Sequence, residues 1–158
     1  MNYKIVKKEA FRVVGVNEHF KMDIEQSFAE VPVFWQKTFE SGIVPKIQAL
    51  NTQEPKALLG ISTCMNGKDF DYYIAVASDA KTIDDMVEYA VPECTWAIFE
   101  CVGAMPHAIQ NLQKRIITEW LPTSGYEYAD APDIEVYGQG DTMSKDYRCE
   151  VWLPIIKK

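Results

Sequence analysis

One acidic residue, Glu150, stands in a strongly apolar stretch between residues 147 and 154, close to the end of the chain. The alternation there and the bulk of Val151, Trp152 and Leu153 predict a largely buried strand. Side chains two apart along a strand share a face, so Glu150 should lie beside Trp152. An unpaired buried carboxylate is costly. Glu150 therefore predicts a buried basic partner, a cationic ligand or proton-transfer chemistry, unless the strand lies at an edge and its carboxylate reaches water.

Four aromatic residues are candidates to line a binding site together with Glu150. Tyr137 lies in a short strand-like run, Tyr147 begins the strand of Glu150, Tyr126 follows a glycine in a loop, and Trp35 belongs to a helical pattern. Aromatic residues make up 12% of the chain, and most of them are expected in the core. Core packing is therefore the alternative for each candidate.

The sequence offers little other chemistry. The two histidines, His19 and His107, have no partners at metal-ligand spacing. The phosphate-binding glycine motifs and the nucleophile-elbow motif do not occur. We therefore expect no metal and no cofactor, and any catalysis has to rely on carboxylates and tyrosines.

Composition restricts the class of protein. The 158 residues, 47% of them hydrophobic, are typical of one globular domain, and no apolar run reaches the ~20 residues of a membrane span. A net charge of −7 without a basic stripe argues against direct nucleic-acid binding. The four cysteines have no paired spacing, and the N-terminus lacks a signal-peptide core. These features favour a cytoplasmic protein without membrane contact.

The chain has two similar halves. Each half opens with a strand, continues with a helix and ends with two strands, at residues 11–16, 57–62 and 72–77 in the first half and 96–103, 133–137 and 147–153 in the second. Asn66-Gly67 predicts a hairpin turn in the first half. Strands gathered around two main helices predict an α+β fold with a mostly antiparallel sheet. We expect one domain over residues 1–158, with pseudo-repeats at about 5–78 and 95–156 and a central groove.

The two helices have recognisable limits. The first follows the apolar spacing of Ile24 to Phe39, with Gly42 as a C-terminal stop. Pro32 lies inside this pattern and predicts either a kink or two short helices. The second helix has Pro106 in its first turn and is ended by Pro122.

Several motifs of the second half occur together in a known family. They are Trp96-Ala97-Ile98-Phe99, Gly103 with Pro106, Glu119-Trp120-Leu121-Pro122, Ser124-Gly125-Tyr126, Pro132-Asp133-Ile134-Glu135-Val136-Tyr137 and Glu150-Val151-Trp152-Leu153-Pro154. In this order they resemble the GyrI-like small-molecule-binding domain, which is also the effector-binding domain of AraC-type and MerR-type multidrug regulators. The first half agrees more loosely, through Pro32 and Trp35 and its strand pair.

The resemblance implies a duplicated strand-helix-strand-strand fold with a central groove for apolar, often cationic and aromatic molecules. It also implies that a glutamate of the last strand, here Glu150, faces that groove. Beside Trp152 such a carboxylate would recognise a delocalised cation through its charge and the ring face together. Trp35, Tyr126, Tyr137 and Tyr147 are the further candidates for ligand contacts.

Three functions remain open on this resemblance. The first is a stand-alone binding domain for hydrophobic aromatic small molecules, without DNA-binding helices of its own and with an unknown protein partner. The second is a hydrolase that opens the cyclopropane rings of DNA-alkylating natural products, with Glu150 as base and Tyr137 as hydrogen-bond donor. Glu100 or Glu135 is the alternative second polar group. A gyrase-inhibitor-like protein interaction ranks last.

Overall fold

Within residues 1–21, 24–63 and 69–158, the part of the chain that the computed structural model describes, nine strands form one antiparallel sheet. The strands are β1 (Tyr3–Lys8), β2 (Phe11–Lys21), β3 (Leu58–Ser62), β4 (Asp69–Ala77), β5 (Val87–Val91), β6 (Cys94–Val102), β7 (Tyr126–Tyr128), β8 (Asp133–Tyr137) and β9 (Arg148–Lys157). The turn predicted at Asn66-Gly67 lies outside the described residues.

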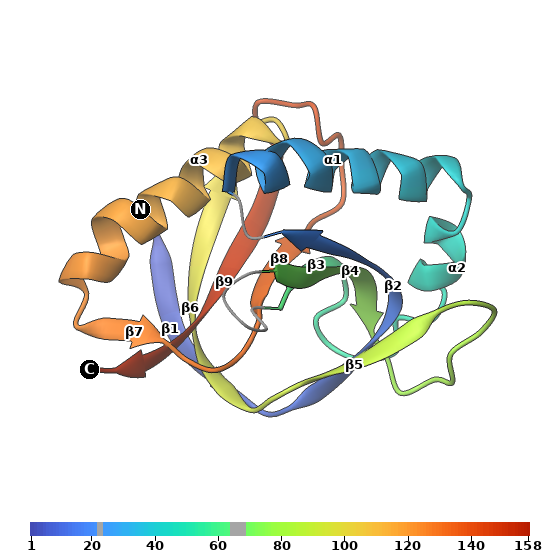
Figure 1. The fold of residues 1–158 in the computed structure, drawn as a ribbon, viewed down its shortest axis with the longest axis horizontal. Helices are drawn as coiled ribbons and strands as arrows, with labels where there is room; N and C mark the ends of the chain where they lie inside the picture. The colour runs from blue at the N-terminus through green and yellow to red at the C-terminus, as the bar shows by residue number, and fades with distance from the viewer. Residues whose placement is uncertain (22–23, 64–68) are drawn as a thin grey trace.

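The helices lie on one side of this sheet. α3 (His107–Arg115) covers one part of the sheet and α1 (Ile24–Glu40) covers the next part (Figure 1). The short α2 (Val44–Gln48) follows α1 in the chain. α3 is prolonged by a π-helical turn at Ile116–Trp120 and a 3-10 turn at Leu121–Thr123. Among the described residues, no helix has the length and hydropathy needed to cross a membrane.

The order of the strands reflects the two halves of the chain. The sheet reads β1-β6-β9-β8-β3-β4-β2-β5, with β7 paired to β9 outside this order. Its centre is the β8–β3 pair, and the equivalent strands of each half follow outward in mirrored order. The predicted α+β class with two main helices is therefore confirmed. The exact limits of the two repeats stay a prediction.

A two-stranded ribbon joins the two edges of the sheet. β1 pairs with β6 and β2 pairs with β5, with Lys8 opposite Cys94 and Phe11 opposite Val91. Because β1 runs directly into β2 and β5 into β6, these pairs continue into one another and pass across the sheet on the side away from the helices (Figure 1). The sheet is thus covered on both faces, which we call the helix face and the ribbon face.

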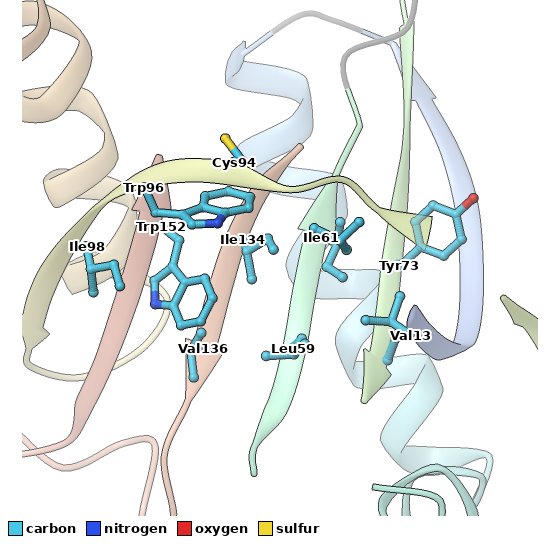
Figure 2. Packing of buried hydrophobic residues seen from close by; sticks show 12 residues of the cluster. Val13, Leu59, Ile61, Tyr73, Cys94, Trp96, Ile98, Ile134, Val136 and Trp152 are labelled. Carbon is cyan, nitrogen blue, oxygen red and sulfur yellow. The ribbon is translucent and has the colours of Figure 1, made fainter. Parts of the chain in front are cut away.

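Each face has its own core. On the ribbon face, Cys94 and Trp96 pack against side chains of the central strands, among them Leu59, Ile61, Ile134, Val136 and Trp152 (Figure 2). On the helix face, Ile109, Leu112 and Ile116 of the α3 segment pack on Val151 and Leu153 of β9. Successive residues of a strand alternate between the two faces. The face of a residue therefore decides whether it meets the helices or the ribbon.

Pro32 lies inside one continuous helix. α1 runs from Ile24 to Glu40, so the alternative of two short helices is wrong, while the predicted stop at Gly42 is confirmed by its φ of +79°. Pro32 has no N–H to donate to the carbonyl of Phe28 four residues earlier. Gln110 of α3 donates its Nε2–H to that carbonyl oxygen at 2.8 Å. The proline thus leaves an acceptor that ties α1 to α3.

This contact leads to a first prediction. Gln110→Ala should lower the free energy of unfolding by about 1 kcal/mol, because the Phe28 carbonyl loses its partner. The loss should be smaller in a Pro32→Ala background, where the restored N–H can bond to Phe28 within the helix. Urea unfolding of the four proteins measures this difference, with Gln36→Ala, which removes an exposed Gln–Glu bond, as the control. Equal losses in both backgrounds would contradict the account.

Candidate functional site

A cavity of about 1340 Å³ lies between the helix face of the sheet and the helices α1 and α3. Its lining combines residues of α1 and α3 with residues of β3, β4, β8 and β9. Three acidic residues, Asp130, Asp133 and Glu135, and one basic residue, Lys56, are among the described lining residues. The cavity therefore favours positive charge over negative charge.

Glu135 is the buried carboxylate of this cavity. It lies in the middle of β8, and only 8% of it is exposed. Gln113 of α3 donates its Nε2–H to one carboxylate oxygen at 2.7 Å. The other oxygen accepts hydrogen bonds from the hydroxyls of Tyr72 and Tyr137, the second at 3.1 Å. Three neutral donors therefore hold the carboxylate in place.

Trp35 extends this network from α1. Its Nε1–H donates to the hydroxyl oxygen of Tyr72 at 2.8 Å, and Tyr72 in turn donates to Glu135. The Trp35 ring meets the Tyr137 ring edge to face, with centroids 5.0 Å apart. A helix residue and two strand residues thus form an aromatic wall beside the carboxylate.

The electrostatics follow from burial. Burial raises the pKa of Glu135, while the hydrogen bonds from Tyr72, Gln113 and Tyr137 act in the opposite direction because they favour the charged form. Burial, and after it the negative charge of Glu135, raises the pKa of Tyr72 and of Tyr137 well above the ordinary value. Both hydroxyls therefore stay protonated and remain donors.

Gly60 makes room for this arrangement. It lies opposite Glu135 in the β3–β8 pair. A Cβ at this position would lie 2.1 Å from the hydroxyl oxygen of Tyr72 and 2.5 Å from Oε1 of Glu135. Only glycine therefore lets the tyrosine reach the carboxylate across the floor of the cavity.

The structure brings three of the predicted site residues together. Trp35, Tyr137 and Tyr147 all line the cavity. Tyr147 is 4% exposed and donates its hydroxyl to the carbonyl of Gly138 at 2.8 Å, so it also supports the loop before β9. Their part in ligand binding stays a prediction.

The other predicted site residues lie elsewhere. Glu150 and Trp152 are on the ribbon face of β9, where the Trp152 Nε1–H donates to Glu150 at 3.1 Å. The expected placement side by side is thus confirmed, but the expectation that Glu150 faces the groove is not met, because its neighbour Val151 occupies the helix face. Tyr126 stacks on Trp120 with ring centroids 6.1 Å apart and is not part of the cavity lining.

Sequence reasoning named Glu135 only as an alternative and missed Tyr72, Gln113 and Gly60. The alternation of β8 carried a usable signal, because Asp133, Glu135 and Tyr137 share one face while Ile134 and Val136 share the other. Tyr72 lies in a nearly continuous buried run and gave no such signal.

Comparison with known proteins agrees with this architecture. A family model described as the GyrI-like small molecule binding domain matches residues 1–156. The chain belongs to this family. A search of the curated proteins gave no match.

Solved structures resemble this GyrI-like domain over almost its whole length. SAV2435 bound to tetraphenylphosphonium is 25% identical with a TM-score of 0.90, over 99% of this chain and 94% of that one. A bacterial transcription regulation protein from Staphylococcus aureus MU50 is 25% identical with a TM-score of 0.82, over 98% of both chains. The EcmrR C-terminal domain, 14% identical with a TM-score of 0.65, covers 99% of this chain and 98% of its own and shares the fold.

Proposed function

We propose that this GyrI-like domain binds lipophilic aromatic cations in the cavity, with Glu135 as the counter-charge, in cytoplasmic xenobiotic protection or sensing. One observation carries the proposal. The buried carboxylate of Glu135 has, among the described residues, hydrogen bonds from three neutral side chains and no ion pair. Neutral donors stabilise a carboxylate but leave its charge uncompensated in a low-dielectric site.

A delocalised cation fits this environment better than an ammonium ion does. It is weakly hydrated, so it loses little on entering an apolar cavity, and it is attracted to the faces of aromatic rings. Trp35 and Tyr137 supply such rings beside Glu135. The ligand bound to SAV2435, tetraphenylphosphonium, has this chemistry.

The experiment compares a cation with a neutral molecule of similar shape. Tetraphenylphosphonium and triphenylphosphine oxide are titrated into the protein while the tryptophan fluorescence, to which Trp35 contributes, is followed. The cation should bind saturably and at least about tenfold more tightly than the oxide, because a desolvated charge-assisted contact is worth more than about 1.4 kcal/mol. Equal affinities for the two molecules would contradict the proposal.

The raised pKa of Glu135 favours one second candidate, hydrolysis of strained cyclopropane rings. A carboxylate whose pKa moves toward neutrality is suited to deprotonate water, and the Tyr137 hydroxyl is placed to donate to the oxygen that gains charge. In this arrangement Glu135 takes the role expected of Glu150. Mass spectrometry of a cyclopropane-containing dienone after incubation detects the added water. If the compound is lost no faster with the protein than in buffer alone, this candidate is excluded.

A further inference from the structure

A second carboxylate, Asp133, lies in the same cavity as Glu135. Asp133 is the first residue of β8, two positions before Glu135, so the two side chains share the helix face about 6.7 Å apart along the strand. Both residues line the cavity. The network around Glu135 does not include Asp133.

The carboxylate of Asp133 has unused hydrogen-bonding capacity. Its Oδ1 atom is buried and has no hydrogen-bond partner among the described residues. Burial, and after it the charge of Glu135, raises the pKa of Asp133 to about 7, although a hydrogen bond from the Tyr128 side chain lowers it. A buried, unsatisfied oxygen of this kind is expensive unless a ligand uses it.

The surroundings of Asp133 are acidic or neutral. Tyr128 and the exposed Asp130 line the cavity beside it, and α1 and α3 contribute uncharged lining residues. Lys56, the basic residue of the described lining, lies shortly before the first residue of β3. Asp133 pairs with Ser62, the last residue of β3, so the two lie toward opposite ends of that strand. The Lys56 Nζ donates to the Asn51 carbonyl at 3.3 Å. The Asp133 end of the cavity therefore has no nearby basic group among the described lining residues.

We propose that Asp133 is a second cation subsite, and that the cavity accepts flat aromatic dications whose two charges are about as far apart as residues 133 and 135. This inference rests on the proposed function, because Glu135 has to bind the first charge. One positive group then lies against Glu135 and the other against Oδ1 of Asp133. The second pairing gives a partner to a carboxylate that the protein itself leaves unsatisfied.

Matched ligands test the second subsite. Methyl viologen has two cationic rings, and N-methyl-phenylpyridinium has nearly the same shape with a single charge. At about pH 8 the wild type should bind the dication at least about tenfold more tightly than the monocation. Asp133→Asn should abolish that preference without weakening the monocation. Glu127→Gln removes an equal charge from an exposed position of β7 outside the cavity lining and should change either affinity by less than about twofold.

The outcomes separate the two proposals. A wild type that binds both ligands equally would overturn the second subsite and leave the proposed function standing. A preference for the dication that survives Asp133→Asn would place the second charge elsewhere and also overturn it. If neither cation binds and tetraphenylphosphonium also fails to bind, the proposed function itself is contradicted.

Acidity provides an independent readout. At a pH below its pKa of about 7, Asp133 is protonated and offers no charge. The preference for the dication should therefore grow as the pH is raised from about 6 to about 8. Besides Lys56, the other titratable groups of the described lining are the carboxyls of Glu135 and Asp130 and the tyrosines Tyr72, Tyr128, Tyr137 and Tyr147. Near neutral pH, calorimetry in two buffers of different ionisation enthalpy should detect a proton released by the dication and much less by the monocation. A preference that does not change with pH would contradict the assignment to Asp133.

Discussion

Replacement of Gly60 by alanine should abolish tight binding of aromatic cations while the protein still folds. The added methyl group would overlap the ends of the Tyr72 and Glu135 side chains, at 2.1 Å and 2.5 Å, and not the backbone. These ends can swing away, which breaks the Tyr72–Glu135 hydrogen bond and misplaces the carboxylate. We expect a loss of about 1–3 kcal/mol in the free energy of unfolding and at least about a tenfold loss of affinity for tetraphenylphosphonium.

A second glycine provides the control for this prediction. Gly42 follows α1 with a φ of +79°, and a Cβ there would meet nothing within 4 Å. Gly42→Ala should cost about 1 kcal/mol through backbone strain, since alanine disfavours this conformation. Because Gly42 is not part of the cavity lining, its replacement should leave the affinity unchanged. Chemical unfolding and ligand titration of both variants separate lost stability from lost binding. Similar affinities for the two variants would show that Gly60 has no special role.

The order of the elements could be predicted from the sequence because most strands and both main helices have local signals. The predicted strand at residues 133–137 corresponds to β8, and the helix predicted between Pro106 and Pro122 corresponds to α3 with its π-helical and 3-10 turns. β1 was missed because its lysines hide a strand that becomes evident only through its pairing with β6. Of the two outcomes expected at Pro32, a kink or two short helices, the second did not occur, and the Phe28 carbonyl accepts a hydrogen bond from Gln110 of α3.

The site was harder to predict than the fold. Glu150 and Glu135 both lie in apolar strands, and the sequence does not tell which side of each strand meets a cavity. The ribbon of β1, β2, β5 and β6 covers the side of Glu150, while the helices leave a cavity on the side of Glu135. That difference depends on strand pairs more than fifty residues apart in the sequence. The periodicity of a single strand therefore cannot show which of its faces borders the cavity.

Glu135→Gln should have the largest effect on cation binding of any conservative change in the cavity. The substitution keeps the size of the side chain and an oxygen for the tyrosine donors, but it removes the charge. Affinity for tetraphenylphosphonium should fall by about 10- to 100-fold, the worth of a charge-assisted contact in a desolvated site. Binding of neutral triphenylphosphine oxide should change little.

The same variant should not be less stable near neutral pH. A carboxyl group whose pKa is raised by folding favours the folded state at low pH, and this contribution is lost as the pH rises through the folded-state pKa. Removal of the charge therefore relieves a penalty near neutral pH. A loss of affinity at unchanged or higher stability cannot be attributed to unfolding.

The most direct measurement is one calorimetric titration of tetraphenylphosphonium into the wild type, Glu135→Gln and Glu150→Gln. The two substitutions remove the same charge from opposite faces of the same sheet, so overall electrostatics cancel in the comparison. We predict that Glu135→Gln binds at least about tenfold more weakly than the wild type and that Glu150→Gln binds like the wild type. Wild-type affinity in Glu135→Gln, or an equal loss in Glu150→Gln, would contradict the assignment of the cavity as the cation site.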